Sequence, residues 1–100
     1  MKTTTLKLVT IIAEDDIEAR LVRDLKELGV KGYTIVNVRG EGLHGARDNA
    51  WEGENIRLET LVSSELADKL FEFLHSTYFP RYLMVVYMEN VEVIRAEKFL

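Results

Sequence analysis

The residue types best suited to hold a ligand lie in a glycine-rich stretch that follows Val38. Arg39 and Arg47 carry guanidinium groups, whose paired N–H donors match the oxygen atoms of a phosphate. Gly40 and Gly42 allow backbone N–H groups to approach an anion closely. We therefore predict an anion site in this stretch. The alternative is a solvated loop in which the glycines only make turns.

The glycines at positions 40, 42 and 45 also follow the spacing Gly-x-Gly-x-x-Gly, which occurs in dinucleotide-binding folds. In those folds a helix begins directly after the glycines. Here Asp48 and Asn49 indicate that the loop continues. The spacing alone therefore does not favour a dinucleotide-binding fold.

Other residues with chemical potential form weaker patterns. Glu41, His44 and Asp48 could ligate a metal, but they lack a fixed metal-ligand spacing. The chain has no cysteine, which excludes disulfides, thiolate metal ligands and a cysteine nucleophile. Asp15 and Asp16 are adjacent, so their side chains point in different directions and suit a helix start better than a catalytic pair. We predict neither an enzyme nor a metal site.

The composition is that of a small globular protein. One hundred residues, 47% hydrophobic and 30% charged, predict a single domain over residues 1–100. A net charge of −4 argues against a nucleic-acid partner, because binding to phosphate backbones needs a basic surface. The chain has no apolar run long enough to span a bilayer and no signal-peptide pattern. We expect a cytoplasmic protein that reaches a membrane only through a partner.

The elements that must position the glycine-rich stretch begin with a strand and a helix. Residues 4–13 are mostly β-branched and apolar, which favours a strand. Residues 15–28 carry apolar side chains at three- and four-residue spacing, which favours an amphipathic helix. A capping box of Asp15 and Glu18 is predicted to begin this helix, and Gly29 to end it.

A second strand over residues 33–38 leads into a long loop. Residues 39–55 show no hydrophobic period until the next strand begins. A loop of this length in a small domain is usually functional or disordered. We therefore expect the function of the chain to depend on this loop.

The second half repeats the strand-helix-strand order. Residues 56–62 alternate apolar and polar side chains, as in a strand with one buried face. Ser63 or Ser64 is predicted to cap a second helix, which ends before the single proline. The continuous apolar run at residues 83–88 predicts a central strand, and residues 91–94 a short fifth strand.

The order β-α-β-loop-β-α-β, with a C-terminal extension at residues 90–100, is that of the split βαβ or ferredoxin-like fold, an α+β class. Both helices of such a fold cover one face of a four-stranded antiparallel sheet. Apolar residues occur on both sides of the first and fourth strands, which predicts that a partner covers the other face. We expect a homotrimer.

The segment LKELGVKGYTIVNVRGEG, residues 25–42, resembles the PII signal-transduction proteins. In that family a leucine-glycine helix end precedes a Gly-x-Thr strand and an Arg-Gly-x-Gly start of a long T-loop. The resemblance implies a homotrimer that binds adenine nucleotides in clefts between subunits. It also implies that Thr34, Arg39, Gly40 and Gly42 lie at the nucleotide-binding strand and the base of the loop.

Two departures separate the chain from nitrogen-signalling PII proteins. Residues 75–82 have no glycine where that group has a second phosphate-binding loop, and the C-terminal basic loop is reduced to Arg95 and Lys98. The chain is more similar to PII-like proteins linked to bicarbonate transport and carboxysomes, with the matching segments GYT at residues 32–34, Arg47, and YFPRY at residues 78–82. This likeness implies ADP, AMP, cyclic AMP or ATP as ligand, with bicarbonate as a further one.

The resemblance implies a regulator that binds an adenine nucleotide and controls a membrane transporter, expected to be one for bicarbonate, through residues 40–54. The predicted nucleotide-binding residues are Thr34, Arg39, Gly40, Gly42, Arg47, Tyr78 and Tyr82. The aromatic pair in this set could stack on or wall the adenine, although an aromatic cluster just past a helix more often packs in the core or at an interface. Rival readings are a trimeric metal- or ion-sensing module, a small enzyme acting on nucleotides, and a purely structural oligomer.

Overall fold

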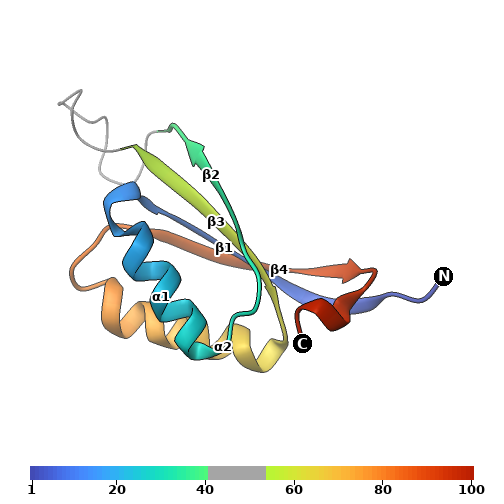
Figure 1. Ribbon diagram of the computed structural model, residues 1–100. Helices are drawn as coiled ribbons and strands as arrows, with labels where there is room; N and C mark the ends of the chain where they lie inside the picture. The colour runs from blue at the N-terminus through green and yellow to red at the C-terminus, as the bar shows by residue number, and fades with distance from the viewer. Residues whose placement is uncertain (41–53) are drawn as a thin grey trace.

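The computed structural model describes residues 1–40 and 54–100 of the chain. These residues form four strands and two main helices, arranged in space as Figure 1 shows. The strands are β1 (Thr4–Glu14), β2 (Thr34–Val38), β3 (Asn55–Val62) and β4 (Val85–Val93), and the helices are α1 (Glu18–Leu28) and α2 (Ser64–Phe73). Short 3-10 helices at Asp15–Ile17 and Ala96–Lys98 and a π-helical turn at Leu74–Tyr78 complete the described elements.

The four strands form one antiparallel sheet in the order β2-β3-β1-β4. β1 and β3 occupy the middle and pair from Lys7 opposite Val62 to Glu14 opposite Asn55. Each βαβ half therefore places its two strands on either side of a strand from the other half. This arrangement confirms the predicted ferredoxin-like fold.

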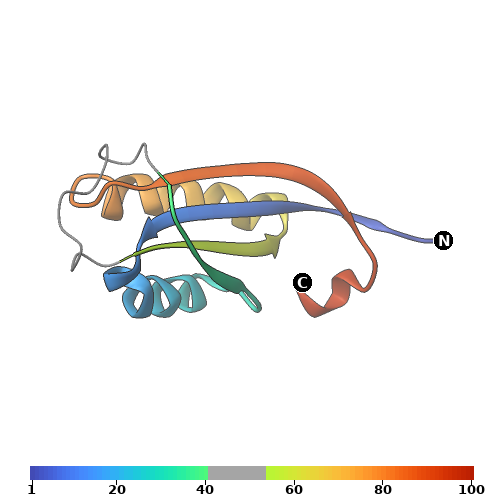
Figure 2. The same cartoon turned by 90° about the horizontal axis from the view of Figure 1, so that it is seen from above.

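Both helices lie on the same face of the sheet, as Figure 1 shows, and Figure 2 shows them running side by side along it. The core between the two layers is formed by wholly buried apolar side chains of the central strands and both helices, among them Val9, Ile11, Leu58, Leu21, Leu25 and Leu70. Full burial of one such side chain stabilises the fold by roughly 1.5–3 kcal/mol. The opposite side of the sheet, which we call the open face, carries no helix.

The start of α1 differs from the prediction. Asp15–Ile17 form a 3-10 turn, and no side-chain cap precedes either this turn or α1. The predicted capping box is therefore wrong. The backbone N–H of Asp15 instead donates to the carbonyl oxygen of Glu54 at 2.8 Å, which continues the contact between the ends of β1 and β3. Gly29 ends α1 in the left-handed conformation, as predicted, with φ of 114°.

The second helix begins and ends as predicted. The hydroxyl of Ser63 accepts a 3.2 Å hydrogen bond from the backbone N–H of Leu66 and caps α2. The chain then widens into the π-helical turn, in which the N–H of Phe79 donates to the carbonyl oxygen of Leu74 at 3.0 Å. Helical structure stops before Pro80, which has no N–H to continue it.

The position of β4 corrects two predictions. β4 lies at an edge of the sheet, not in its centre. Residues 91–93 lengthen it and form no fifth strand, because β1 is long enough for Thr4 to pair with Val93. The run is therefore not buried on both faces. Two of its residues, Val85 and Tyr87, lie on the open face and remain 43% and 44% exposed.

The open face of one subunit thus presents apolar surface. Val36 of β2, at the other edge of the sheet, is also exposed there. The expectation that a partner covers this face stays a prediction, based on these exposed apolar side chains. Among the helices in residues 1–40 and 54–100, none is both long and apolar enough to cross a membrane.

Candidate functional site

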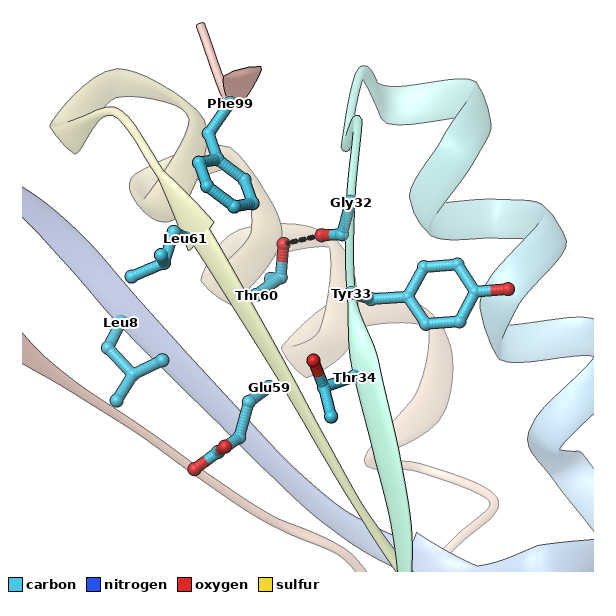
Figure 3. Close-up of a pocket in the computed structure, with 8 residues that line it drawn as sticks. All are labelled: Leu8, Gly32, Tyr33, Thr34, Glu59, Thr60, Leu61 and Phe99. Carbon is cyan, nitrogen blue, oxygen red and sulfur yellow. Dashed lines mark hydrogen bonds between the residues drawn. The ribbon is translucent and has the colours of Figure 1, made fainter. Parts of the chain in front are cut away.

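An open pocket of about 330 Å³ lies where the start of β2 meets β3, and Figure 3 shows it in close-up. We call it the β2–β3 pocket. Its lining is mainly apolar with a few polar groups and comprises Leu8, Gly32, Tyr33, Thr34, Glu59, Thr60, Leu61 and Phe99. Three strands and the C-terminal segment therefore contribute to one concave site, the usual form of a small-molecule site.

Alternation along β2 decides which side chain enters the pocket. Figure 3 shows Thr34 on the same side of the strand as Glu59, whereas Tyr33 points the opposite way, toward α1. Thr34 pairs directly with Glu59 across the two strands, so their side chains are neighbours on the open face. Tyr33 instead lies near Lys26 of α1, whose Nζ is 5.8 Å from the centre of the ring.

One hydrogen bond fixes the start of β2. The hydroxyl of Thr60 donates to the carbonyl oxygen of Gly32 at 2.6 Å, and Thr60 itself is only 2% exposed. This contact holds the backbone of Gly32 beside β3 before the strand pairing begins at Thr34. The wall of the pocket is therefore rigid at the point where a ligand would touch the backbone.

The charged group of the pocket is Glu59. Its Oε2 atom lies 3.7 Å from Nε of Arg57, two residues earlier on the same face of β3. This distance is too long for a hydrogen bond, and Arg57 Nε has no hydrogen-bond partner among the described residues. The positive charge of Arg57 therefore attracts the carboxylate of Glu59 without a hydrogen bond, and the carboxylate oxygens can still accept hydrogen bonds from a ligand.

The last wall of the pocket comes from the far end of the chain. After β4 the chain turns into the 3-10 helix Ala96–Lys98, which places Phe99 against Gly32. Its ring lies in the pocket with Leu8 and Leu61 (Figure 3). The pocket thus has aliphatic and aromatic walls that suit a flat, apolar ring system.

Several lining residues were missed by the sequence reasoning. The alternating pattern of residues 56–62 already placed Glu59 and Leu61 on one face, so their joint position was available from the sequence. Gly32 precedes the predicted Thr34 by two residues and entered the sequence analysis only as the first residue of the GYT segment, not as a site residue. No local pattern connects Phe99 with β2, because its position depends on how the C-terminal segment folds back.

Two of the predicted phosphate-binding residues lie at the opposite end of β2. Arg39 and Gly40 directly follow this strand and are exposed. Arg39 is five residues from Thr34, roughly 17 Å along an extended backbone. The structure thus places Thr34 and Arg39 at the two ends of one strand. Gly42 and Arg47 lie outside the described residues.

Tyr78 lies in the core and not at the pocket. It is wholly buried on the helix side of the sheet, and its hydroxyl donates to Oδ2 of Asp24 at 2.6 Å. Burial, together with the hydrogen bond to the Asp24 carboxylate, raises the pKa of the Tyr78 phenol well above its usual value. Because no part of the ring is exposed, the expected stacking of Tyr78 on an adenine is not available, and packing explains this residue.

Tyr82 is half-buried and lies close to Tyr78. Its hydroxyl accepts a 3.0 Å hydrogen bond from Nη1 of Arg20, whose guanidinium carbon is 5.9 Å from the centre of the Tyr82 ring. Tyr82 also lines a second, smaller hollow of about 180 Å³ with Glu14, Ile17, Arg81 and Leu83. Neither tyrosine of the predicted set is part of the β2–β3 pocket.

Metal ligation finds no support in the described part of the chain. Residues 1–40 and 54–100 contain no group of three or more histidine, cysteine, aspartate or glutamate side chains arranged to hold an ion. The metal ligands considered from the sequence, Glu41, His44 and Asp48, lie outside the described residues. The β2–β3 pocket itself offers a ligand apolar walls, a hydroxyl and a carboxylate.

The chain is similar to known proteins over nearly its whole length. The family model for nitrogen regulatory protein P-II matches residues 6–98. A PII-like signalling protein from Thermus thermophilus is 53% identical, with full coverage of both chains and a TM-score of 0.87. CPII from Thiomonas intermedia is 32% identical in a structure with ADP, AMP and acetate, covering 99% of this chain and 98% of CPII with a TM-score of 0.86.

A second CPII structure, with ADP and bicarbonate, has the same identity and coverage and a TM-score of 0.85. The likeness therefore includes the strands of the pocket as well as the C-terminal segment that closes it. PII signalling proteins are regulators without enzymatic activity. With a matching family model over residues 6–98 and a ferredoxin-like fold, the chain belongs to the PII family, as a PII-like signalling protein.

Proposed function

We propose that this PII-like subunit binds an adenine nucleotide with its base in the β2–β3 pocket. The nucleotide-bound state is proposed to regulate a membrane transporter, and bicarbonate is the proposed transported ion. The observation that carries the proposal is the pocket itself, whose walls suit a flat base. Structures of CPII contain ADP and AMP, and one contains bicarbonate with ADP. The 32% identity between this chain and CPII supports the same ligand classes for this chain.

The polar groups of the pocket favour adenine over guanine. Adenine carries an exocyclic amino group that can donate to the carboxylate of Glu59 or to the hydroxyl of Thr34. Guanine presents a carbonyl oxygen at position 6, which a carboxylate repels, so the preference applies to a base that turns position 6 toward Glu59 and not to a guanine that turns its N1–H and 2-amino donors there. A buried or partly buried polar group left without a partner costs about 1–3 kcal/mol, enough for clear discrimination between the bases.

The phosphates would extend along β2 toward Arg39. This residue and Gly40 follow the strand, so a nucleotide with its base at Thr34 points its phosphates at the start of the long loop. Arg47 is proposed as the second phosphate contact from the loop, with Gly42 as a backbone donor. The absence of a glycine-rich second phosphate loop at residues 75–82 favours ADP, AMP or cyclic AMP over ATP.

The open face of the sheet is proposed as the contact between subunits of a homotrimer. Val36, Val85 and Tyr87 leave apolar surface there that a single subunit does not cover. In such a trimer each β2–β3 pocket would lie near a neighbouring subunit. Light scattering on wild-type protein and on Tyr87→Glu should give a trimer and a smaller species, respectively. A wild-type monomer would exclude this assembly.

Regulation is proposed to act through residues 40–54. A nucleotide shifts the loop between two conformations only if it binds one of them more tightly. Arg39 and Arg47 would supply this difference, because each could contact the phosphates in one loop conformation and not in the other. The loop would then bind or release the transporter at the cytoplasmic side of a membrane. A membrane extract passed over immobilised protein, with and without ADP, tests this step. A variant lacking residues 41–53 is the control and should retain no transporter in either condition.

Calorimetric titration with ATP, ADP, AMP and cyclic AMP tests the binding step, with GDP as the matched control for the base. We expect heat with at least one adenine nucleotide, weak or no heat with GDP, and a change in ADP affinity when bicarbonate is added. The variant Thr34→Val, which removes one hydroxyl from the pocket, should bind the adenine nucleotide several-fold more weakly. No heat with any of the four adenine nucleotides would overturn the proposed function.

A further inference from the structure

The C-terminal segment, residues 95–100, folds back onto the subunit through an unusual turn. Arg95 has φ of 65° and ψ of 45°, and it is the only non-glycine residue with positive φ in residues 1–40 and 54–100. This left-handed turn reverses the chain after β4 and returns it toward the start of β2 (Figure 1). An arginine in this conformation is strained, so contacts further along the segment must hold it in place.

Those contacts are few. Ala96 is buried, Phe99 contacts Gly32, and Nζ of Lys31 donates a hydrogen bond to the carbonyl oxygen of Leu100. Inside the segment, the N–H of Phe99 donates to the carbonyl oxygen of Ala96 at 2.9 Å, within one turn of 3-10 helix. An element with so few buried contacts opens at a much lower free energy than the sheet.

The contact between Phe99 and Gly32 depends on the missing side chain of the glycine. A Cβ atom at Gly32 would lie 3.2 Å from Cε1 of Phe99, which is closer than side chains normally pack. The ring is only half-buried, and it lines the β2–β3 pocket together with Leu8 and Leu61. Figure 3 shows the ring reaching into the pocket from the side opposite Glu59.

We propose that Phe99 is a stacking residue for the base of the nucleotide, so that docking of the C-terminal segment and filling of the β2–β3 pocket support each other. The inference rests on the proposed function, which supplies the flat ligand. Aromatic rings stack on nucleobases without needing a hydrogen-bond pattern. Because coupling between two binding events is reciprocal, the segment raises nucleotide affinity by the factor by which the nucleotide favours the docked segment.

Affinity measurements on variants of the segment test this proposal. Phe99→Ala, and a chain ending at Ile94, should bind ADP about five- to tenfold more weakly than the wild type, since an aromatic pair contributes about that factor. Phe99→Tyr keeps a flat ring and should bind as the wild type does. Leu100→Ala is the matched control, because it changes an exposed side chain of the same segment and keeps the backbone oxygen that Lys31 contacts.

A fluorescent residue at the same position reads the contact directly. In the double variant Trp51→Phe and Phe99→Trp, the only tryptophan stands at position 99. Binding of ADP should quench its emission, whereas ribose 5-phosphate, which has no base, should leave it unchanged. The inference is overturned if ADP binds the wild type and Phe99→Ala equally well, or if ADP binds the double variant without a change in emission. Failure of the wild type to bind any adenine nucleotide overturns the proposed function as well.

Discussion

The hydroxyl of Thr60 donates a 2.6 Å hydrogen bond to the carbonyl oxygen of Gly32, two residues before β2 and β3 begin to pair. This bond extends the contact between the two strands into the segment that forms the pocket wall. It also positions the glycine against which Phe99 packs. The geometry of the β2–β3 pocket therefore depends on a side chain that belongs to the core.

Thr60→Val tests this dependence, because valine keeps the branched shape of threonine and replaces the donor hydroxyl with a methyl group. We expect the free energy of unfolding to fall by about 1 kcal/mol, the usual net contribution of one hydrogen bond. ADP affinity should fall several-fold, since Gly32 and Thr34 are held less firmly. Urea unfolding and calorimetry measure the two effects. Thr60→Ser keeps the donor and should restore the affinity; an unchanged affinity in the valine variant would show that the bond does not support the site.

Glu59→Gln should weaken the preference for adenine. The carboxylate accepts from the amino group of adenine and repels the carbonyl oxygen of guanine, whereas an amide can also donate to that oxygen. We expect the ratio of GDP to ADP dissociation constants to fall at least fivefold, mainly through tighter GDP binding. Glu72→Gln on the exposed side of α2 removes the same charge far from the pocket and should leave the ratio unchanged. An unaltered ratio in Glu59→Gln would exclude this carboxylate from base recognition.

The two arginines should contribute according to the number of phosphates. Arg39→Ala and Arg47→Ala each remove a guanidinium group, and a charge-assisted hydrogen bond contributes about 1.5–3 kcal/mol. We therefore expect a loss of at least tenfold in ADP affinity for each variant, a smaller loss for AMP, and none for adenosine. Lys69→Ala on α2 removes an equal charge from an exposed helix position and serves as the control. Equal losses for ADP and adenosine would mean that the arginines act on the fold and not on phosphate.

The fold could be predicted because local patterns and the order of the elements agree. The leucine spacing of α1, the capping serine of α2 and the alternation of β3 each indicate the element that forms. The position of β4 could not be read from its apolar run, since a run exposed on an uncovered face resembles a run buried on both faces. The predicted start of α1 was wrong for a different reason. The backbone N–H of Asp15 donates to Glu54, and its side chain does not cap a helix.

Of the residues predicted from the sequence, only Thr34 lines the candidate pocket, and Arg39 follows the same strand at its other end. Thr34 and Arg39 belong to one strand and the residue after it, so a local pattern contains both. Phe99 enters the pocket through a left-handed turn at Arg95, a residue type that gives no signal for such a turn. Tyr78 was assigned to the ligand because its aromatic neighbours suggested stacking, whereas its hydroxyl is used to bind Asp24 inside the core.

Tyr78→Phe should lower stability at neutral pH without changing nucleotide affinity. The variant keeps the ring and leaves the Asp24 carboxylate without its 2.6 Å donor, so we expect a loss of about 1–3 kcal/mol in urea unfolding. Tyr87→Phe, at an exposed position, should cost far less. A loss of ADP affinity in Tyr78→Phe at unchanged fold would return this residue to the binding site.

The same tyrosine should make stability depend on pH in alkaline solution. Burial and the hydrogen bond to Asp24 raise the pKa of Tyr78 in the folded state, so the unfolded chain loses this proton first. The contribution of Tyr78 is therefore complete below about pH 10, the pKa of an unfolded tyrosine, and is lost as the pH rises toward the folded pKa. We expect wild-type stability to fall above that pH by up to about 1.4 kcal/mol more per pH unit than that of Tyr78→Phe. Parallel curves for the two proteins would contradict the raised pKa.

The end of α1 offers a test of backbone conformation alone. Gly29 has φ of 114° and no atom within 4 Å of the place where a Cβ would lie, so Gly29→Ala adds strain but no clash. We expect the free energy of unfolding to fall by about 1–2 kcal/mol, the cost of the left-handed conformation for an L-residue. Gly40→Ala is the matched control, because its Cβ also meets open space and its φ lies outside the left-handed region. Equal stability of the two variants in urea would mean that α1 can end without the left-handed residue.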